Sequence, residues 1–579
     1  MSEMSDQARG VIFVVIALGI LFLWSHYFSP PVPHEQKGNP EHATAASQPA
    51  TPPPPSTQVP APASGAARVT PHTTPVIRAA AESTIVVDSP LYRVALSNRG
   101  GSVRSWKLKK YLDDQKPPKP LDLVNAESSQ ELGWPFSLMI SDTPLESQAN
   151  TELYQVSAVT RGETVPAEER EFQAPVSITF HFSDGHLEAT KKLNFTQDYQ
   201  LTVEASVSLD GKELPAAIAW RGGFGDKEVY RGSQLVNVFY SQGGRLTLLP
   251  YKKLGIPNNQ SQPASQAGPL EFAGVEDQYF AATFIPGGMA DMSLWDWTQN
   301  HNTSVDGKQE AEPIAEAAAG TTQPGPLRMR MYVGPKDLAL LSKVQPSLEV
   351  LVNFGWTGVI AKPLLFILQW LHRYIPNYGW VIIVLTLIIN FAAFPLKMKS
   401  WRSMQRMQKV APEVRSIQDR YKKYSMTDPR KKKMNEEIMA IYQREGINPM
   451  GSCLPMVIQM PIWWALWRVL TGAIELRHAP WIGWIHDLSA KDPYYILPIA
   501  MAITMYLMTK MTPQTTVDPA QQKMMGLMPL FFAAFFFTLS SGLNLYMFTS
   551  NIIGVSQQYY LNRTQPLPSN SKFKKKKVG

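Results

Sequence analysis

The sequence has 579 residues, a formal net charge of +8 and one cysteine, Cys453. This length exceeds that of one ordinary domain, and one cysteine excludes both an intramolecular disulfide and a cysteine-rich metal site. The mean hydropathy of -0.16 is that of a soluble protein, but it averages two unlike parts. Apart from the N-terminus, residues before about position 350 are mostly polar, whereas apolar runs flanked by Trp recur afterwards. This contrast predicts a soluble domain joined to a polytopic α-helical membrane domain.

The N-terminal region combines an apolar segment with a low-complexity stretch. Residues 11–28 are just long enough to cross a bilayer, and no small-residue cleavage site follows at the usual distance. We therefore interpret residues 1–28 as an uncleaved signal-anchor rather than as a removed signal peptide. Residues 29–81 contain PPVP and TPPPP, a composition that cannot bury a core and is typical of an extended tether.

Residues 82–335 have the pattern of an all-β domain. Short segments alternate apolar and polar residues and are separated by turn sequences such as NRGG and SDG. The clearest strands are STIVVDS, LYRVALS, SVRSWKLKKY, VSITFHF, LEATKKLNF and YQLTVEASVSL. Regularly spaced strands favour an antiparallel sandwich. Residues 258–268 and 300–325 are expected to form loops, and His181 and His186 lack the carboxylate cluster that a metal site would need.

The C-terminal part contains the predicted spans. Residues 336–378 form a connector whose apolar segment is interpreted as a helix lying on the membrane, with a full span as the alternative. Five spans follow within a core of residues 379–563, and the N-terminal anchor makes six spans in total. Pro412 is expected to kink or restart the helix that contains it. The five core spans are predicted at residues 379–396, 453–470, 494–511, 525–539 and 542–560.

The positive charge of the chain is concentrated in one loop between the first two core spans. Residues 397–444 contain 14 Lys or Arg and five Asp or Glu. Short loops rich in Lys and Arg stay in the cytosol, so this loop is predicted to be cytosolic. The alternation of spans then places both termini, including the basic tail 564–579, in the cytosol and the β domain outside.

The basic loop, residues 398–447, is predicted to be a helical hairpin because its apolar residues recur at spacings of three or four. One interpretation is that these apolar stripes only pack against each other. The other is a docking surface for nascent chains, anionic lipid or ribosomal RNA, since methionine adapts to varied apolar partners and basic side chains attract phosphate. The candidate contact residues are Trp401, Met404, Met407, Arg415, Lys422 and Lys423.

Polar side chains occur within the predicted spans. A single one commonly hydrogen-bonds a neighbouring helix, but the set favours a water-accessible cavity. The spans contain no His, Asp or Glu, which argues against a proton relay and against intramembrane metalloprotease or aspartyl protease chemistry. No catalytic residue, metal or cofactor is expected, and no nucleotide-binding motif is present. The polar residues are Thr386, Asn390, Gln459, Thr504, Asn544, Ser550 and Asn551.

Several long motifs between residues 332 and 563 resemble the YidC/Oxa family of membrane protein insertases. They are MYVGPKDLALL, GINPMGSCLPMVIQMPIWWALWRVL, APWIGWIHDLSAKDPYYILPI, DPAQQKMMGLMPLFF and SSGLNLYMFTSNIIGVSQQYYLNR. The β domain resembles the family less specifically, through VALSNRGGSVRSW and DQYFAATFIP. Gram-negative members carry a large outer domain after an N-terminal anchor. The resemblance therefore implies a multi-pass protein of the bacterial inner membrane with its β domain in the periplasm.

The resemblance also implies a mechanism and a set of partners. Five core spans would surround a hydrophilic groove that is open to cytosol and lipid but closed to the outside. This groove would receive newly made membrane proteins, alone or from the Sec translocon, with the ribosome and membrane lipid as further partners and no small-molecule substrate. The candidate groove residues are Thr386, Asn390, Gln459, Tyr546, Ser550 and Asn551.

The sequence departs from the family pattern at one groove position. Many bacterial members have an arginine where this sequence has Asn390, so polarity is kept and charge is not. We hypothesise that Lys397 or Lys399, about two helical turns further on, partly compensates.

Two other functions stay open at this stage. One is a polytopic channel or solute transporter with a periplasmic sensor domain, although transporters commonly show inverted repeats and none is evident. The other is a purely structural subunit of the Sec complex.

Overall fold

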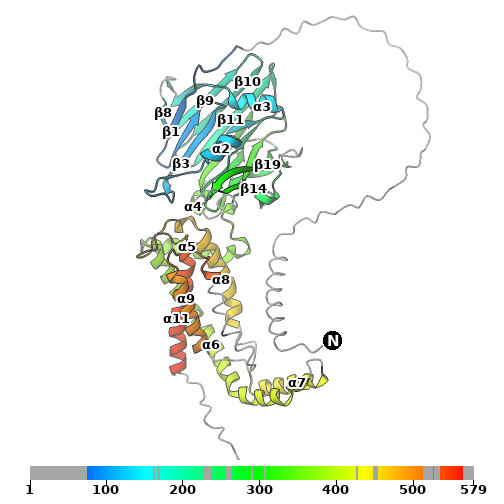
Figure 1. The fold of residues 1–579 in the computed structure, drawn as a ribbon, viewed down its shortest axis with the longest axis vertical. Coiled ribbons are helices and arrows are strands. Elements are labelled where there is room, and N and C mark those ends of the chain that lie inside the picture. Colours follow the sequence, from blue (N-terminus) through cyan, green and yellow to red (C-terminus); the bar gives the residue numbers. More distant parts are fainter. Residues whose placement is uncertain are drawn as a thin grey trace, which may run out of the picture.

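The computed structural model describes most of the chain from residue 75 to residue 564. In it a β domain stands at one end of a helical region, and the hairpin helix α7 lies at the other end (Figure 1). The predicted anchor 1–28, the tether as far as residue 74, most of the predicted span 525–539 and the tail after residue 564 lie outside the described residues. The described residues are 75–160, 163–165, 170–226, 236–255, 264–288, 291–305, 308–424, 428–447, 454–512, 526 and 535–564.

The central sheet of the β domain runs in the order β15-β14-β17-β18-β21-β11-β10-β9-β6-β7, and β12 pairs with β11. Neighbouring strands within it are antiparallel. Its strands are β6 (Gln155–Thr160), β7 (Glu163–Val165), β9 (Val176–Ser183), β10 (Leu187–Phe195), β11 (Gln200–Leu209), β12 (Lys212–Glu213), β14 (Asn237–Gln242), β15 (Arg245–Pro250), β17 (Leu270–Glu276), β18 (Phe280–Pro286) and β21 (Leu327–Pro335).

Two five-stranded sheets complete the domain, in the orders β4-β3-β2-β1-β8 and β16-β19-β20-β13-β5. The first consists of β1 (Thr84–Asp88), β2 (Tyr92–Ser97), β3 (Ser102–Leu112), β4 (Pro120–Asp122) and β8 (Glu171–Gln173). The second consists of β5 (Ser137–Met139), β13 (Ala217–Trp220), β16 (Ala264–Gln266), β19 (Ser293–Val305) and β20 (Lys308–Gly320). Two short helices that the sequence analysis missed, α2 (Ala126–Leu132) and α3 (Thr143–Thr151), lie beside them.

The six strands that were predicted most clearly are confirmed. Burial alternates strictly along β10 and β11, because successive side chains of a strand point to opposite faces of its sheet. The inward faces form one apolar core with large aromatic side chains, among them Trp106, Phe180, Trp220 and Phe239. The alternating sequence pattern therefore predicted both the strands and their buried faces.

The prediction of a loop over residues 300–325 was wrong. Strands β19 and β20 pair continuously from Ser293 opposite Gly320 to Val305 opposite Lys308. The dipeptide DG at positions 306–307 is a strong hairpin signal, but the alanine-rich second half has low intrinsic strand propensity. Burial overrides that propensity, since residues 317–319 are fully buried alanines. Of the other predicted loop, residues 264–266 form strand β16.

Within the described residues, the helical region contains five long helices and the second arm of the hairpin. The longest helix, α6, unites the predicted span 379–396 with the first arm of the basic hairpin and continues through Pro412. The predicted restart at Pro412 is therefore wrong. Proline removes one backbone hydrogen bond, but packing against α7 holds both sides of this position in one helix. The helices are α4 (Leu338–Leu341), α5 (Gly358–His372), α6 (Tyr378–Arg420), α7 (Pro429–Arg444), α8 (Leu454–Gly472), α9 (Ile496–Met511) and α11 (Ser541–Thr564), with the short turns η2 (Tyr251–Lys253), η3 (Glu349–Leu351), η4 (Gly355–Thr357) and η6 (Ile474–Leu476).

Helices fall on four of the five predicted core spans, and of the fifth, 525–539, the structure describes only residues 526 and 535–539, of which 537–538 form a turn. By length and composition, α6 is the one helix among the described residues that is long and apolar enough to cross a membrane, and α9 is a shorter apolar helix. Helices α8 and α11 cover the predicted spans 453–470 and 542–560. The count of six spans and the placement of α5 on the membrane surface stay predictions.

One inward-facing position of the central sheet is a lysine. The ammonium of Lys191 on β10 is fully buried and donates to the carbonyl oxygens of Gly100 at 2.6 Å, Gly101 at 3.3 Å and Phe136 at 2.6 Å. Both glycines have positive φ in the turn between β2 and β3, and at Gly100 a Cβ would lie 2.3 Å from the Asn150 carbonyl oxygen. Lys191 thus ties the central sheet to the turn of a neighbouring sheet.

We expect Lys191→Met to lower the free energy of unfolding of the β domain by about 2–4 kcal/mol, because three buried carbonyl groups lose their donor. Lys192→Met is the matched control, since its side chain is 44% exposed and lies 4.0 Å from Glu204, and its effect should stay within about 0.5 kcal/mol. Denaturant unfolding of the full chain in detergent measures both. Equal stability of the two variants would contradict the role given to Lys191.

Candidate functional site

A cavity of about 570 Å³ lies between helices α5, α6, α8, α9 and α11. Most of its wall is apolar, and four of the twelve lining residues are polar. We call this cavity the groove. Its polar residues come from three different helices, α6, α8 and α11, so only the folded bundle brings them together. The lining residues are Ile360, Leu364, Ile389, Ala392, Ala393, Leu396, Lys397, Gln459, Ile462, Met508, Ser550 and Asn551.

The contact between α6 and α11 places a cation in the groove wall. Asn390 and Lys397 are seven residues apart on α6, which is two helical turns, so they share one face. The Lys397 Nζ donates to the Asn390 Oδ1 at 2.8 Å and to the Gln557 Oε1 at 3.3 Å. The hypothesis that Lys397 compensates for the missing arginine therefore has a structural basis, whereas Lys399 is exposed.

Helix α11 contacts this face of α6 through two residues that have the same spacing. Ser550 and Gln557 are also seven residues apart. The Asn390 Nδ2 donates to the Ser550 Oγ at 3.3 Å, and the Gln557 Nε2 donates to the Asn390 carbonyl oxygen at 3.5 Å. The amide of Asn390 thus acts as donor to one helix and as acceptor from the lysine. Sequence reasoning missed Gln557, although its seven-residue spacing from Ser550 was a usable signal.

The predicted groove residues separate into two layers. Gln459, Ser550 and Asn551 line the groove as expected. Thr386 and Asn390 are almost fully buried behind the wall, which corrects the expectation that they line it. Both side chains also hydrogen-bond the α6 backbone: the Thr386 Oγ1 donates to the Ile382 carbonyl oxygen at 2.6 Å, and the Asn390 Nδ2, besides its bond to Ser550, donates to the Thr386 carbonyl oxygen at 2.9 Å.

The two remaining predicted groove residues are Tyr546, which lies behind the lining residues, and Asn551, which lines the groove. Tyr546 is buried in the apolar core of the helical region, and its hydroxyl has a side-chain hydrogen bond with Gln459. It therefore supports a lining residue and does not line the groove itself. The Asn551 Nδ2 is buried and has no hydrogen-bond partner within the described part of the chain. A water or a bound polar group in the groove would satisfy it.

The basic hairpin has its own core. Met407 is buried with apolar residues of both arms, and Trp401 is buried as well, so neither offers a surface to a partner, contrary to expectation. Met407 packs against the second arm instead. Met404 is half-buried, while Arg415, Lys422 and Lys423 are exposed. The exposed cations stay candidates for contact with acidic partners.

A hydrogen bond and ion pairs connect the two arms of the hairpin. The Tyr421 Oη donates to the Glu437 Oε1 at 2.7 Å, and the Arg444 Nη2 lies 2.8 Å from the Glu413 Oε2. The ion pair of Arg444 and Glu413 is exposed, so it contributes little to stability. Within the described residues, no group of three His, Cys, Asp or Glu is arranged to hold a metal ion.

The comparisons with known proteins cover nearly the whole chain. Residues 84–367 match the family model "YidC periplasmic domain", and residues 370–568 match the model "60Kd inner membrane protein". The chain is 31% identical over 564 residues to the membrane protein insertase YidC of Methylobacillus flagellatus, covering 96% of this chain and 97% of that protein. It is 33% identical over 481 residues to the YidC of Cupriavidus taiwanensis, covering 83% and 82%.

A solved structure titled "Active YidC insertase crystal structure with the first transmembrane domain resolved" also matches. It is 20% identical, covers 84% of this chain and 94% of its own chain, and superposes with a TM-score of 0.34.

A hydrated groove makes a prediction about cysteine labelling. With Cys453 replaced by serine, Ser550→Cys in membrane vesicles should react with a small water-soluble maleimide, because the side chain at position 550 lines the groove. Ser541→Cys on the same helix is the matched control, since Ser541 is fully buried, and it should react at least roughly tenfold more slowly. Labelling at position 550 as slow as at position 541 would mean that the groove is dry.

Proposed function

The chain belongs to the YidC family of membrane protein insertases, and from this premise we propose how its groove assists insertion. As a member, it inserts newly made membrane proteins into the inner membrane, and its β domain is periplasmic. The relatives do not favour a solute transporter or a channel. We propose that the groove accepts the polar segment of the substrate and that Lys397 is the cation that this segment meets.

The observation that carries this proposal is the set of partners of Lys397. Its side-chain hydrogen-bond partners among the described residues, Asn390 and Gln557, are neutral amides. Among the described residues no carboxylate pairs with it, so the groove wall keeps a net positive charge. In a cavity with mostly apolar walls, such a charge attracts an anionic group more strongly than it would in water.

The energetics fit a passive device. One charge at the centre of a membrane helix costs about 2.5–3.5 kcal/mol on the insertion scale. A hydrated groove that reaches partway into the bundle shortens this crossing, and the cation offsets part of the cost for acidic segments. The apolar span of a substrate supplies about 0.3–0.6 kcal/mol per strongly apolar residue, or roughly 6–12 kcal/mol for 20 residues.

In this scheme Asn390 is a positioning residue. It is almost fully buried, and its amide oxygen holds the Lys397 ammonium. Lysine is a compact point charge on a flexible stem, and the hydrogen bond to Asn390 limits that flexibility. The missing arginine is thereby replaced by a pair, in which Asn390 supplies the polarity and Lys397 the charge.

Topology and further partners extend the proposal. The excess of Lys and Arg in residues 397–444 supports a cytosolic hairpin, cytosolic termini and six spans in total. The exposed cations Arg415, Lys422 and Lys423, together with the KKKK run of the tail at 574–577, suit an acidic surface such as ribosomal RNA or anionic lipid. We also propose that substrates arrive either alone or from the Sec translocon.

We expect Lys397→Met to slow the insertion of a small substrate with an acidic translocated tail by roughly fivefold, because a charge-assisted contact is lost. Lys399→Met is the matched control, since Lys399 lies two residues away and is exposed, and it should insert at nearly the parent rate. Proteoliposomes containing the purified full chain measure both rates. A normal rate for Lys397→Met would contradict the proposed role of the cation.

A second prediction separates polarity from charge at position 390. Asn390→Leu should impair insertion, because it removes the acceptor of Lys397 and the donor to Ser550. In the Lys397→Met background, Asn390→Arg should restore insertion to within about twofold of the parent rate, since a long cation from this position reaches the same wall. The proteoliposome assay measures these rates. If Asn390→Arg does not restore insertion in the Lys397→Met background, the groove needs Lys397 itself.

A further inference from the structure

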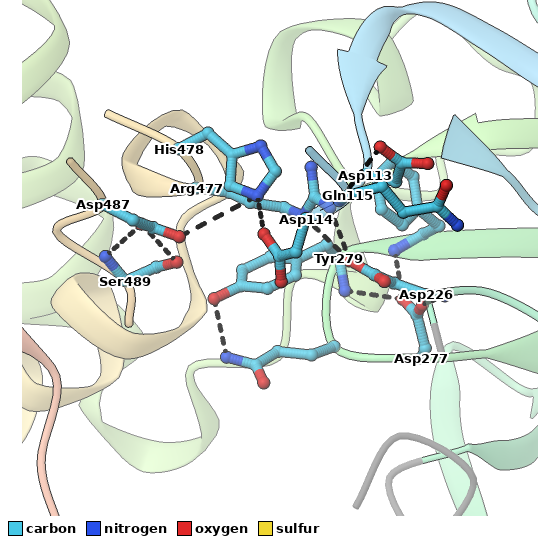
Figure 2. A network of polar contacts seen from close by, with 12 residues as sticks. Asp113, Asp114, Gln115, Asp226, Asp277, Tyr279, Arg477, His478, Asp487 and Ser489 are labelled. Carbon is cyan, nitrogen blue, oxygen red and sulfur yellow. Dashed lines mark hydrogen bonds and ion pairs between the residues drawn. The ribbon is translucent and has the colours of Figure 1, made fainter. Parts of the chain in front are cut away.

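One loop of the helical region makes close contacts with the β domain. Residues 473–493 connect α8 to α9, and we call this segment the outer loop. Its Arg477 donates from Nε at 3.2 Å and from Nη2 at 2.5 Å to the Asp226 Oδ2 in the β domain (Figure 2). The two side chains are 4% and 1% exposed. A buried ion pair thus joins parts of the chain that are far apart in sequence.

The carboxylate of this pair is held rigidly by the β domain. The Asp226 backbone N–H donates to the Asp277 Oδ2 at 2.8 Å. The other oxygen of Asp277 accepts from the backbone N–H groups of Tyr279 at 2.7 Å and Phe280 at 2.6 Å, where the turn after β17 enters β18. Asp226 is therefore placed by a turn of the central sheet, and Arg477 binds an anion whose position is already fixed.

Other contacts also join the β domain to the helical region beside this ion pair. Ile474 of the outer loop belongs to the apolar core of the β domain. The Gln278 Nε2 donates to the Thr471 carbonyl oxygen at 2.6 Å at the end of α8. The His478 Nε2 lies 2.6 Å from the Asp114 Oδ1, and this pair is more exposed, at 27% and 54% (Figure 2). The β domain therefore holds the first third of the outer loop by apolar and polar contacts together.

The rest of the outer loop covers the ends of α6 and α11. The Asn377 Nδ2, at the start of α6, donates to the carbonyl oxygens of Pro480 and Trp481 at 3.2 and 3.1 Å. The ring of Trp481 packs so closely on Gly379 that an added Cβ would lie 2.1 Å from it. At the start of α11 the backbone N–H groups of residues 541 and 542 donate to carbonyl oxygens of residues 490 and 488.

These observations connect the β domain to the groove. The outer loop covers the first turns of α6 and α11, and further along the same two helices Asn390 and Gln557 bind Lys397. We propose that Arg477 is a positioning residue for insertion: by binding Asp226 it lets the β domain clamp the outer loop over α6 and α11, which closes the groove on the periplasmic side. This inference rests on the proposed function of the groove.

The physical reason is the cost of separating the pair. An arginine or aspartate left buried without its partner is strongly unfavourable. In a single variant, the free energy therefore falls when the loop moves and exposes the unpaired group to water. Local opening of this kind leaves the rest of the fold intact. The neighbouring pair of His478 and Asp114 is more exposed, and its loss should matter little because solvent replaces it.

The experiment uses the full chain with Cys453→Ser and a reporter, Ala479→Cys, in the outer loop. Ala479 is buried, so the reporter should react slowly with a membrane-impermeant maleimide added from the β-domain side. We expect Arg477→Met and Asp226→Asn each to raise the labelling rate roughly tenfold or more and to lower insertion severalfold. The double variant should be no worse than either single one, and His478→Ala should change both rates less than about twofold.

A charge exchange, Arg477→Asp with Asp226→Arg, is the rescue, and it should recover part of both the protection and the insertion. Unchanged labelling in Arg477→Met and Asp226→Asn would overturn the clamp, and faster labelling with normal insertion would overturn the positioning role. If Arg477→Met does not accumulate, Asp226→Asn preserves shape and decides alone. Lys397→Met is measured in parallel: if the parent chain inserts and Lys397→Met is also normal, the proposed groove function fails independently of the clamp.

Discussion

The pairing of α6 with α11 is the contact on which the groove depends. An ammonium group beside an apolar wall is unfavourable unless polar groups surround it. Asn390 and Gln557 provide them from the two facing helices, and each also bonds across the contact. Separating the helices would remove the bonds of Gln557 to Lys397 and to the Asn390 backbone and the bond of Ser550 to Asn390, and would leave Asn390 as the one remaining side-chain partner of the cation among the described residues. The position of the buried charge and the packing of the two helices therefore depend on each other at this contact.

At the other end of the same helices the connection is indirect. Asn377 of α6 and the first turn of α11 both bond to the outer loop, which bridges them with backbone carbonyl groups. A loop can cover helix ends only if its own polar groups are satisfied. The carboxylate of Asp492 shows how this is achieved, since it accepts from the Trp484 indole and from the backbone N–H of Leu497. This end of the bundle is thus covered by a folded loop, and in our proposal the β domain clamps that loop in place.

The sequence predicted the elements of this molecule better than their associations. Alternation revealed β10 and β11, and the apolar run and basic stripe revealed both halves of α6, because these signals are local. The hairpin of β19 and β20 was missed because burial between sheets, and not propensity, stabilises its alanine-rich strand. In the groove, all faces of α6 and α11 are nearly equally apolar, so periodicity did not show that Asn390 points behind the wall while Lys397 lines it. That distinction needs the partner helix.

The two cations discussed above, Arg477 and Lys397, differ in what surrounds them. This difference makes the two sides of the helical bundle electrostatically unlike. Arg477 binds a carboxylate, so their charges cancel and the pair serves only as a fastening. Lys397 is bound by neutral amides, which orient it without neutralising it. In the proposed mechanism, a substrate that enters from the hairpin end meets this net positive charge, while the outer loop closes the end beneath the β domain. An acidic segment would then be drawn into the groove as far as Lys397, and its further passage would depend on the adjoining apolar span entering the lipid.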